Sequence, residues 1–405
     1  MREKLTYLFS VVFFASLLLA QLPSVARSQT EPALTETPSP GTIPTATPET
    51  ITRTVFLPWV AYSWFGVPPL PDPLPIPIVY TSTSTVDFAA AKQEVESAGL
   101  LMGYNKIGFH TGPSGNRTGI SDHFRQLDAA GVPIFIKSVD DAGPIFEVQQ
   151  LGEQSGVPHI MVYRKHGGGF ELPNYDNDPI AEARIHYERH VSAWPPELDY
   201  TKVWMETINE PDKGRSEWLA IYSLEVAKLA VADGRKVAAF SWSAGEPEVE
   251  HWESAAMLEY FRYAAEHKEN VAVALHEYSL VSNEISRSYP YLVGRFQFLF
   301  EVLDKRGIDR PTVLITEWGW AATGVPDVDN GMEDIAWTNQ LYNAHPEILG
   351  AGLWYLGGNF EDIANKAVKF IEPVGEYSTQ TYFGVAPGKG EIDMSLFYDP
   401  QKPTR

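Results

Sequence analysis

Two stretches of this chain share one pattern, and together they decide the fold that we expect. Residues 203–212 read VWMETINEPD and residues 313–320 read VLITEWGW. Each is an apolar, strand-like run that leads to a glutamate, Glu210 or Glu317. Pro211 lacks a backbone N–H, so we expect the first strand to end there. A carboxylate at the end of a buried strand suits a reactive group on a rigid element, although a surface glutamate in an ordinary strand-to-loop turn is the simpler interpretation.

Six further strand-like runs alternate with helical patterns over residues 104–383. We predict strands at 106–110, 133–140, 159–164, 202–210, 236–243, 271–278, 312–318 and 351–356. The intervening helices are predicted to begin near Ser121, Pro144, Pro179, Ser216, Trp252, Tyr291, Asp334 and Asp362. The mostly continuous apolar strands are typical of a parallel sheet that is covered on its outside. Eight such units predict an α/β fold, a (β/α)8 TIM barrel. The alternative is an open doubly wound sheet, but residues 110–115 lack the spacing of its glycine-rich phosphate turn.

The amino-terminal part of the chain differs in composition from the barrel segment, which we place at 86–405. Residues 1–26 combine a charged start, an apolar run and small residues, which predicts a signal peptide; an uncleaved membrane anchor is the alternative. The Pro/Thr-rich segment 27–54 predicts a disordered spacer. Residues 55–85 are rich in aromatic residues and proline. We expect a strap packed on the barrel, with a sugar- or surface-binding element as the alternative.

Composition excludes several functional classes. The chain has 405 residues, 44% of them hydrophobic, which is enough for a large core. A net charge of −21 disfavours nucleic acid and other polyanions as partners. The absence of cysteine excludes disulfides, thiol nucleophiles and cysteine-based zinc sites. Because no known metal-binding spacing occurs, we expect neither a metal nor another cofactor.

The ends of the predicted strands supply the candidate site, because active sites of such barrels lie at the carboxyl ends of the strands. This rule selects the following residues: Asn209, Glu210, His276, Tyr278, Glu317 and Trp354. Two facing carboxylates are the minimum needed to break a glycosidic bond. For His276 a core histidine, and for Trp354 a core tryptophan, are the alternative interpretations.

The Asn-Glu-Pro sequence on the fourth strand and Thr-Glu-Trp-Gly on the seventh resemble the retaining glycoside hydrolases of clan A. This large group of (β/α)8 enzymes includes cellulases, mannanases and β-xylosidases. The resemblance covers residues 104–383, and it is strengthened by the His-x-Tyr pattern on the sixth strand and the tryptophan on the eighth. It implies a carbohydrate substrate.

The resemblance also implies roles for the two glutamates. Glu210 would be the general acid/base, with a pKa raised by an apolar surround and by the neighbouring carboxylate. Glu317 would be the nucleophile and would remain ionised. Their carboxyl groups should lie about 5–5.5 Å apart, the retaining geometry. Two nearby glutamates are not expected to form the pair, because Glu206 lies deeper in the barrel and Glu277 faces away.

Four residues would support the pair according to the same resemblance. Asn209 would bond the sugar 2-hydroxyl. Because neighbouring side chains of a regular strand point to opposite faces, Asn209 and Glu210 can both face the cleft only if the strand end is kinked. Tyr278 would donate to the nucleophile, and His276 would steer the acid/base or a hydroxyl. Trp354 would stack on the sugar at the cleavage point.

One position departs from the family. Many members carry an arginine near the end of the second strand, where this chain has Lys137, and a lysine cannot reproduce the bidentate fork. That supporting role is therefore open. His110, Arg164, Lys165 and His166 are plausible subsite residues without individual roles.

We expect a secreted, retaining glycoside hydrolase that acts on a neutral or weakly charged polysaccharide or oligosaccharide. A cell-surface association through the spacer is compatible with this, and we expect no integral membrane domain after signal cleavage. Two alternatives stay open: a non-catalytic carbohydrate-binding barrel on a stalk, and a transglycosylase, which shares the covalent intermediate.

Overall fold

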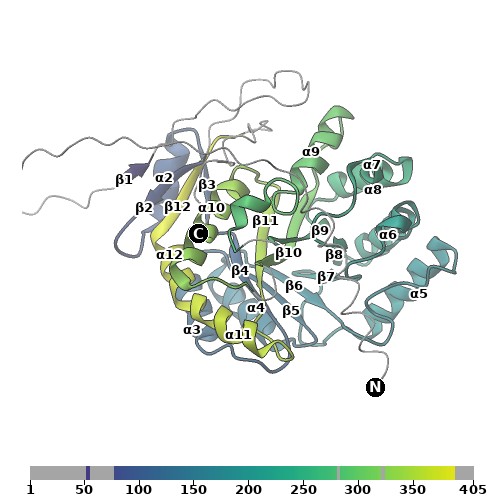
Figure 1. Ribbon diagram of the computed structural model, residues 1–405, viewed down its shortest axis with the longest axis horizontal. Helices are drawn as coiled ribbons and strands as arrows, with labels where there is room; N and C mark the ends of the chain where they lie inside the picture. The colour runs from purple at the N-terminus through teal and green to yellow at the C-terminus, as the bar shows by residue number, and fades with distance from the viewer. Residues whose placement is uncertain (1–51, 55–76, 281–282, 321–323, 388–405) are drawn as a thin grey trace, which may run out of the picture. The chain divides into compact units, whose positions relative to one another are not determined.

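The structure is a computed structural model that describes residues 52–54, 77–280, 283–320 and 324–387 (Figure 1). These residues belong to one compact unit, 49–405. The predicted signal peptide 1–26, most of the predicted spacer and the aromatic part of the predicted strap lie outside the described residues. No helix among the described residues is both long enough and apolar enough to cross a membrane.

Eight parallel strands close into a barrel, which confirms the predicted TIM-barrel architecture. In chain order the strands are β4 (Ile107–Thr111), β5 (Phe135–Val139), β6 (Ile160–Arg164), β7 (Val203–Glu206), β8 (Lys236–Trp242), β9 (Val271–Tyr278), β10 (Thr312–Gly319) and β11 (Ile348–Trp354). Each strand pairs with the next along the chain, and β11 pairs with β4 to close the ring. The alternative of an open sheet is therefore wrong.

Helices surround the barrel strands (Figure 1). They are α3 (Ile120–Ala129), α4 (Gly143–Ser155), α5 (Pro179–Ser192), α6 (Ser216–Ala232), α7 (Val249–Trp252), α8 (Ala255–Glu266), α9 (Phe296–Lys305), α10 (Val328–Asn343), α11 (Glu361–Ala367) and α12 (Ile371–Gln380); α2 (Phe88–Ser97) precedes the barrel. Two predicted starts are wrong. Helix α10 begins well before Asp334, because the Asp327 carboxylate accepts the Asn330 N–H as an N-cap. Helix α9 begins after Tyr291, and the buried Glu277 carboxylate accepts the N–H of Arg295 at its start.

A second, antiparallel sheet was not predicted. It contains β1 (Thr52–Thr54), β2 (Ile78–Thr81), β12 (Thr381–Val385) and β3 (Leu101–Gly103), in that order. Strand β1 lies at the end of the predicted spacer, and β2 lies within the predicted strap. A cavity of about 650 Å³ is lined by β3, by the end of β12 and by residues at the amino ends of the barrel strands. The sheet therefore lies at the end of the barrel opposite the candidate glutamates.

The barrel interior is filled by a few large side chains that face small ones. Its buried apolar cluster contains Phe135, Val162, Trp204, Ala238, Ala272, Ala274 and Leu314. Glycines on β4 and β11 make room for the backbone and the ring of Phe135 respectively. A Cβ added at Gly108 would lie 1.8 Å from the Phe135 carbonyl oxygen, and one at Gly350 would lie 2.5 Å from its ring. This apolar cluster, the floor of the barrel, closes the barrel interior below the candidate site.

Replacing Gly108 with alanine tests this packing. The added methyl would overlap the Phe135 backbone, so we expect the free energy of unfolding to fall by about 3 kcal/mol in urea denaturation. Gly131→Ala is the control, because a Cβ there meets nothing within 4 Å and only its φ of +77° opposes alanine. That change should cost about 1 kcal/mol. Equal losses in both variants would contradict the proposed floor.

Candidate active site

Glu210 lies in the loop that follows β7, and not on the strand itself. The predicted strand 202–210 is too long, because β7 ends at Glu206. Beyond that residue the backbone bonds to neighbouring loops and strand ends: the Asn209 N–H donates to Glu171 O, and the Glu210 N–H donates to Ser241 O, at 2.9 and 3.0 Å. Glu210 has a φ of +44°, a left-handed conformation that breaks the strand alternation. The kink needed at this strand end is therefore present.

Glu317 projects into the barrel from β10, where the strand pairing is irregular. The register with β9 shifts just before Glu317, so that consecutive side chains both face inward. Thr316 donates a hydrogen bond to the buried Glu206, while Glu317 Oε1 lies 3.1 Å from Lys137 Nζ. Glu317 Oε2 accepts the Tyr278 hydroxyl proton at 2.7 Å. Glu317 is thus a buried carboxylate with donors on both oxygens.

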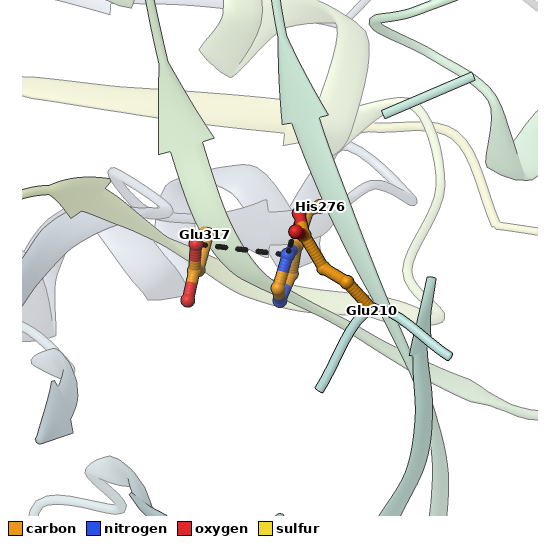
Figure 2. Close-up of side chains that lie close together, drawn as sticks. All are labelled: Glu210, His276 and Glu317. Carbon is orange, nitrogen blue, oxygen red and sulfur yellow. Dashed lines mark hydrogen bonds and ion pairs between the residues drawn. The ribbon is translucent and has the colours of Figure 1, made fainter. Parts of the chain in front are cut away.

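His276 lies between the two glutamates, as Figure 2 shows. Its Nδ1 is 3.1 Å from Glu210 Oε1 and 3.6 Å from Glu317 Oε2. One oxygen of each glutamate and one ring nitrogen lie within 4.8 Å of one another. Ser243 also donates to Glu210 Oε1, at 3.0 Å. Sequence reasoning missed Ser243, although it directly follows β8 and the strand-end rule selects that position.

The two carboxylates differ in exposure and in charge environment. The Glu317 side chain is 10% exposed and the Glu210 side chain 41%. Burial raises the pKa of Glu317, but the positive charges of His276, Lys137 and Arg164 outweigh the effect of burial and hold that pKa well below its usual range. Burial also raises the pKa of Glu210, but the hydrogen bond and the charge of His276 outweigh the effect of burial, so the pKa of Glu210 is lowered overall. The raised pKa that we expected for Glu210 is therefore wrong.

Lys137 does reach Glu317, with a single nitrogen in place of a guanidinium fork. Arg164, for which the sequence predicts no individual role, brings its Nη1 within 3.6 Å of Glu317 Oε1. His110 Nδ1 lies 3.8 Å from the same oxygen. Burial and the charge of Lys137 lower the pKa of His110 well below its usual value, so its ring is neutral. Lys165 and His166 are engaged elsewhere, with Asp140 and Glu171 respectively.

Several buried polar atoms around Glu317 have no hydrogen-bond partner among the described residues. They include both ring nitrogens of His110, Nε and Nη1 of Arg164, and Nε2 of His276; Oδ1 of Asn209, in the loop after β7, is also without a partner among the described residues. Buried polar atoms are normally satisfied, so these atoms are available to hydrogen-bond water or a polar ligand. A molecule with several hydroxyl groups fits both the donors and the acceptors among them.

Trp354 lies at the end of β11, beside Tyr278, and is half-buried. Its ring contacts the Tyr278 ring edge-on, with centroids 6.1 Å apart, and stacks on Tyr355 at 5.4 Å. Phe360, which is exposed, lies 4.8 Å from it. The peptide bond between Trp354 and Tyr355 is cis. An aromatic surface is therefore available beside the glutamates.

The other two glutamates occupy the positions predicted for them. Glu206 is fully buried inside the barrel. Glu277 is also fully buried, but it faces the helices, where it accepts the backbone N–H of Gly294 and of Arg295 and the Tyr342 hydroxyl. Burial raises the pKa of Glu277 to about 7.

Glu210, His276 and Glu317 each offer one ligand atom in a geometry that could hold a metal ion. The cations of Lys137 and Arg164 lie beside Glu317, however, and would repel a metal there. The charges around the cluster therefore favour its use as an acid–base site.

Comparison with known proteins gives only distant structural likenesses. No protein-family model matches the chain, and no curated protein matches it. XacCel5A is 11% identical, over 66% of this chain and 99% of its own, with a TM-score of 0.39. A tri-modular GH5 (subfamily 4) endo-beta-1,4-glucanase from Bacillus licheniformis, complexed with cellotetraose, is 14% identical, over 71% and 61%, with a TM-score of 0.37. The YdjI aldolase from Escherichia coli K12 is 11% identical, over 73% and 98%, with a TM-score of 0.30. These scores are too low to carry a functional argument.

The depressed pKa of Glu317 predicts a pH dependence of stability. A carboxyl with a lower pKa in the folded state adds stability above its unfolded pKa, near 4.5, and loses that stability as pH falls. A pKa that is lower by one in the folded protein than in the unfolded chain corresponds to about 1.4 kcal/mol of stability. In urea denaturation between pH 6 and pH 2.5, wild type should therefore lose stability more steeply than Glu317→Gln. If the free energies of unfolding of the two proteins fell equally with pH, the charged environment assigned to Glu317 would be contradicted.

Proposed function

We propose that this protein is a retaining glycoside hydrolase that acts on neutral or weakly charged polysaccharides or oligosaccharides. The observation that carries the proposal is the pair Glu210 and Glu317, which approach each other at the carboxyl-terminal end of the barrel, one from the loop after β7 and the other from β10. Their nearest oxygens lie within 4.8 Å. That spacing supports a retaining mechanism, because an inverting pair is about 6.5–9.5 Å apart to admit a water molecule.

Glu317 has the properties of a nucleophile. Its pKa is held well below the usual range, and donors from Lys137 and Tyr278 fix both oxygens. In the first step an oxygen of Glu317 bonds to the anomeric carbon while the glycosidic carbon–oxygen bond breaks. Tyr278 has a pKa raised well above its usual value by burial and by Glu317, so it remains a donor throughout.

Glu210 has the exposure expected of an acid/base that meets both the leaving group and water. It donates a proton to the departing oxygen, then takes a proton from the water that releases the sugar from Glu317. In the free protein His276 keeps the pKa of Glu210 low. A bound sugar would displace water from the exposed Glu210 side chain, which raises the pKa of a carboxyl and favours transfer of the proton from His276.

The surrounding residues favour a carbohydrate. Trp354 offers a ring face for the C–H face of a pyranose, and Asn209 Oδ1 is an unsatisfied acceptor. His110 and Arg164 add unsatisfied groups for further hydroxyls. The net charge of −21 argues against a strongly anionic polymer. The composition of residues 1–26 supports secretion of the enzyme.

Sugar release from plant, fungal and bacterial polysaccharides tests the proposal. Wild type should release reducing sugars from at least one polymer, and Glu317→Gln should release none while still binding that polymer. Glu182→Gln, a buried carboxylate on α5, is the matched control and should retain activity. Glycan binding by both proteins without release would instead favour the carbohydrate-binding barrel. Longer products with excess acceptor sugar would favour the transglycosylase.

The role of Glu210 predicts a dependence on the leaving group. Glu210→Gln should slow hydrolysis of substrates with poor leaving groups by on the order of 10²–10⁴-fold. Aryl glycosides with activated leaving groups need no proton in the first step, so their bond cleavage should change little. The comparison of kcat/KM for the two substrate types checks this. Equal losses on both types would exclude the assigned role.

A further inference from the structure

A third carboxylate, Glu206, lies deeper in the barrel than the proposed catalytic pair. It is fully buried, and Lys137 Nζ lies 2.7 Å from its Oε2. The hydroxyls of Ser241 and Thr316 donate to its Oε1 at 2.5 and 2.8 Å. A buried carboxylate is costly unless it is paired and hydrogen-bonded, and these contacts meet that requirement.

Glu206 lies beside two of the residues that support the catalytic pair, Lys137 and His276. Lys137 bridges Glu206 and Glu317, with its Nζ 3.1 Å from the latter. On the other side, His276 Nε2 lies 3.7 Å from Glu206 Oε1, while its Nδ1 faces Glu210 at 3.1 Å. One buried group therefore connects the proposed nucleophile with the proposed acid/base.

The charges of this cluster balance only when His276 is protonated. The ionisable groups that face one another here are His110, Lys137, Arg164, Glu206, Glu210, His276, Tyr278 and Glu317. Three carboxylates face two permanent cations, so one positive charge is missing. Burial lowers the pKa of His276, but the charge of Glu317, the nearby carboxylate of Glu206 and the hydrogen bond to Glu210 raise it above its usual value. His110 does not supply the charge, because its pKa is lowered.

We infer that Glu206 is a positioning residue: it holds Lys137 against Glu317 and retains the proton that His276 presents to Glu210. The catalytic consequence rests on the proposed function, whereas the coupling of Glu206 to His276 exists without substrate. A carboxylate in this place sets the charge state of both catalytic groups without touching the sugar.

Glu206→Gln tests the coupling in the substrate-free protein. Glutamine keeps the shape and an acceptor for the two hydroxyls but removes the charge. In ¹H–¹⁵N spectra, with the His276 signal assigned through His276→Asn, the titration midpoint of His276 should move to lower pH by about one unit or more. Glu182→Gln should leave the midpoint unchanged, because Glu182 bonds Asn174 and Asn177 in a loop. An unmoved midpoint in Glu206→Gln would overturn the inference.

Kinetics provide the second readout. On a polymer that wild type hydrolyses, Glu206→Gln should lower kcat at pH 7 by on the order of 10²-fold, with little change in KM. The basic limb of its pH profile should move to lower pH. A uniform loss at every pH would indicate a merely structural role and overturn the inference. A shifted His276 midpoint in a protein that hydrolyses no sugar would support the coupling and overturn the proposed function.

A conservative variant guards against misreading a general structural effect. Glu206→Asp keeps a carboxylate between Lys137 and His276, so its His276 midpoint should stay closer to the wild-type value than that of Glu206→Gln. A folded Glu206→Asp protein whose midpoint falls as far as that of Glu206→Gln would overturn the inference.

Discussion

Three carboxylates enclosed in one barrel mouth impose the constraint on which the rest of this site depends. Glu206, Glu210 and Glu317 would repel one another strongly in a medium from which water is partly excluded. Lys137 and Arg164 supply two fixed positive charges, and His276 supplies a third when protonated. The site is therefore an electrostatic unit in which the protonation of one group depends on all the others.

This arrangement needs departures from regular strand geometry. In a regular strand, neighbouring side chains point to opposite faces, so one strand end would supply fewer inward groups. The register shift in β10 turns both Thr316 and Glu317 inward, and a shift in β8 brings Ser241 to Glu206. Glu210 reaches the cluster from a loop with a positive φ. The irregular backbone therefore brings polar groups together at one end of an otherwise regular barrel.

The apolar floor complements the polar mouth. Phe135 and Trp204 fill the barrel interior against glycines and alanines on neighbouring strands. Lys137 lies two residues beyond Phe135 on β5, and Glu206 lies two residues beyond Trp204 on β7, so the same inward face changes from apolar to charged along each strand. The floor excludes water from below, which strengthens every charge interaction above it.

The sequence by itself determined the barrel, since eight apolar runs alternating with helices have few other ways to bury their surfaces. It also pointed to Glu210, Glu317, His276, Tyr278 and Trp354, because residues at strand ends meet at one edge. Strand periodicity carries no information on bulges, caps or contacts between distant strands, so it missed the antiparallel sheet and the contact of Lys137 with Glu317. Ser243, by contrast, stands at a strand end where the sequence could have pointed to it. The pKa of Glu210 was decided by the tertiary structure alone, because it depends on how closely His276 approaches.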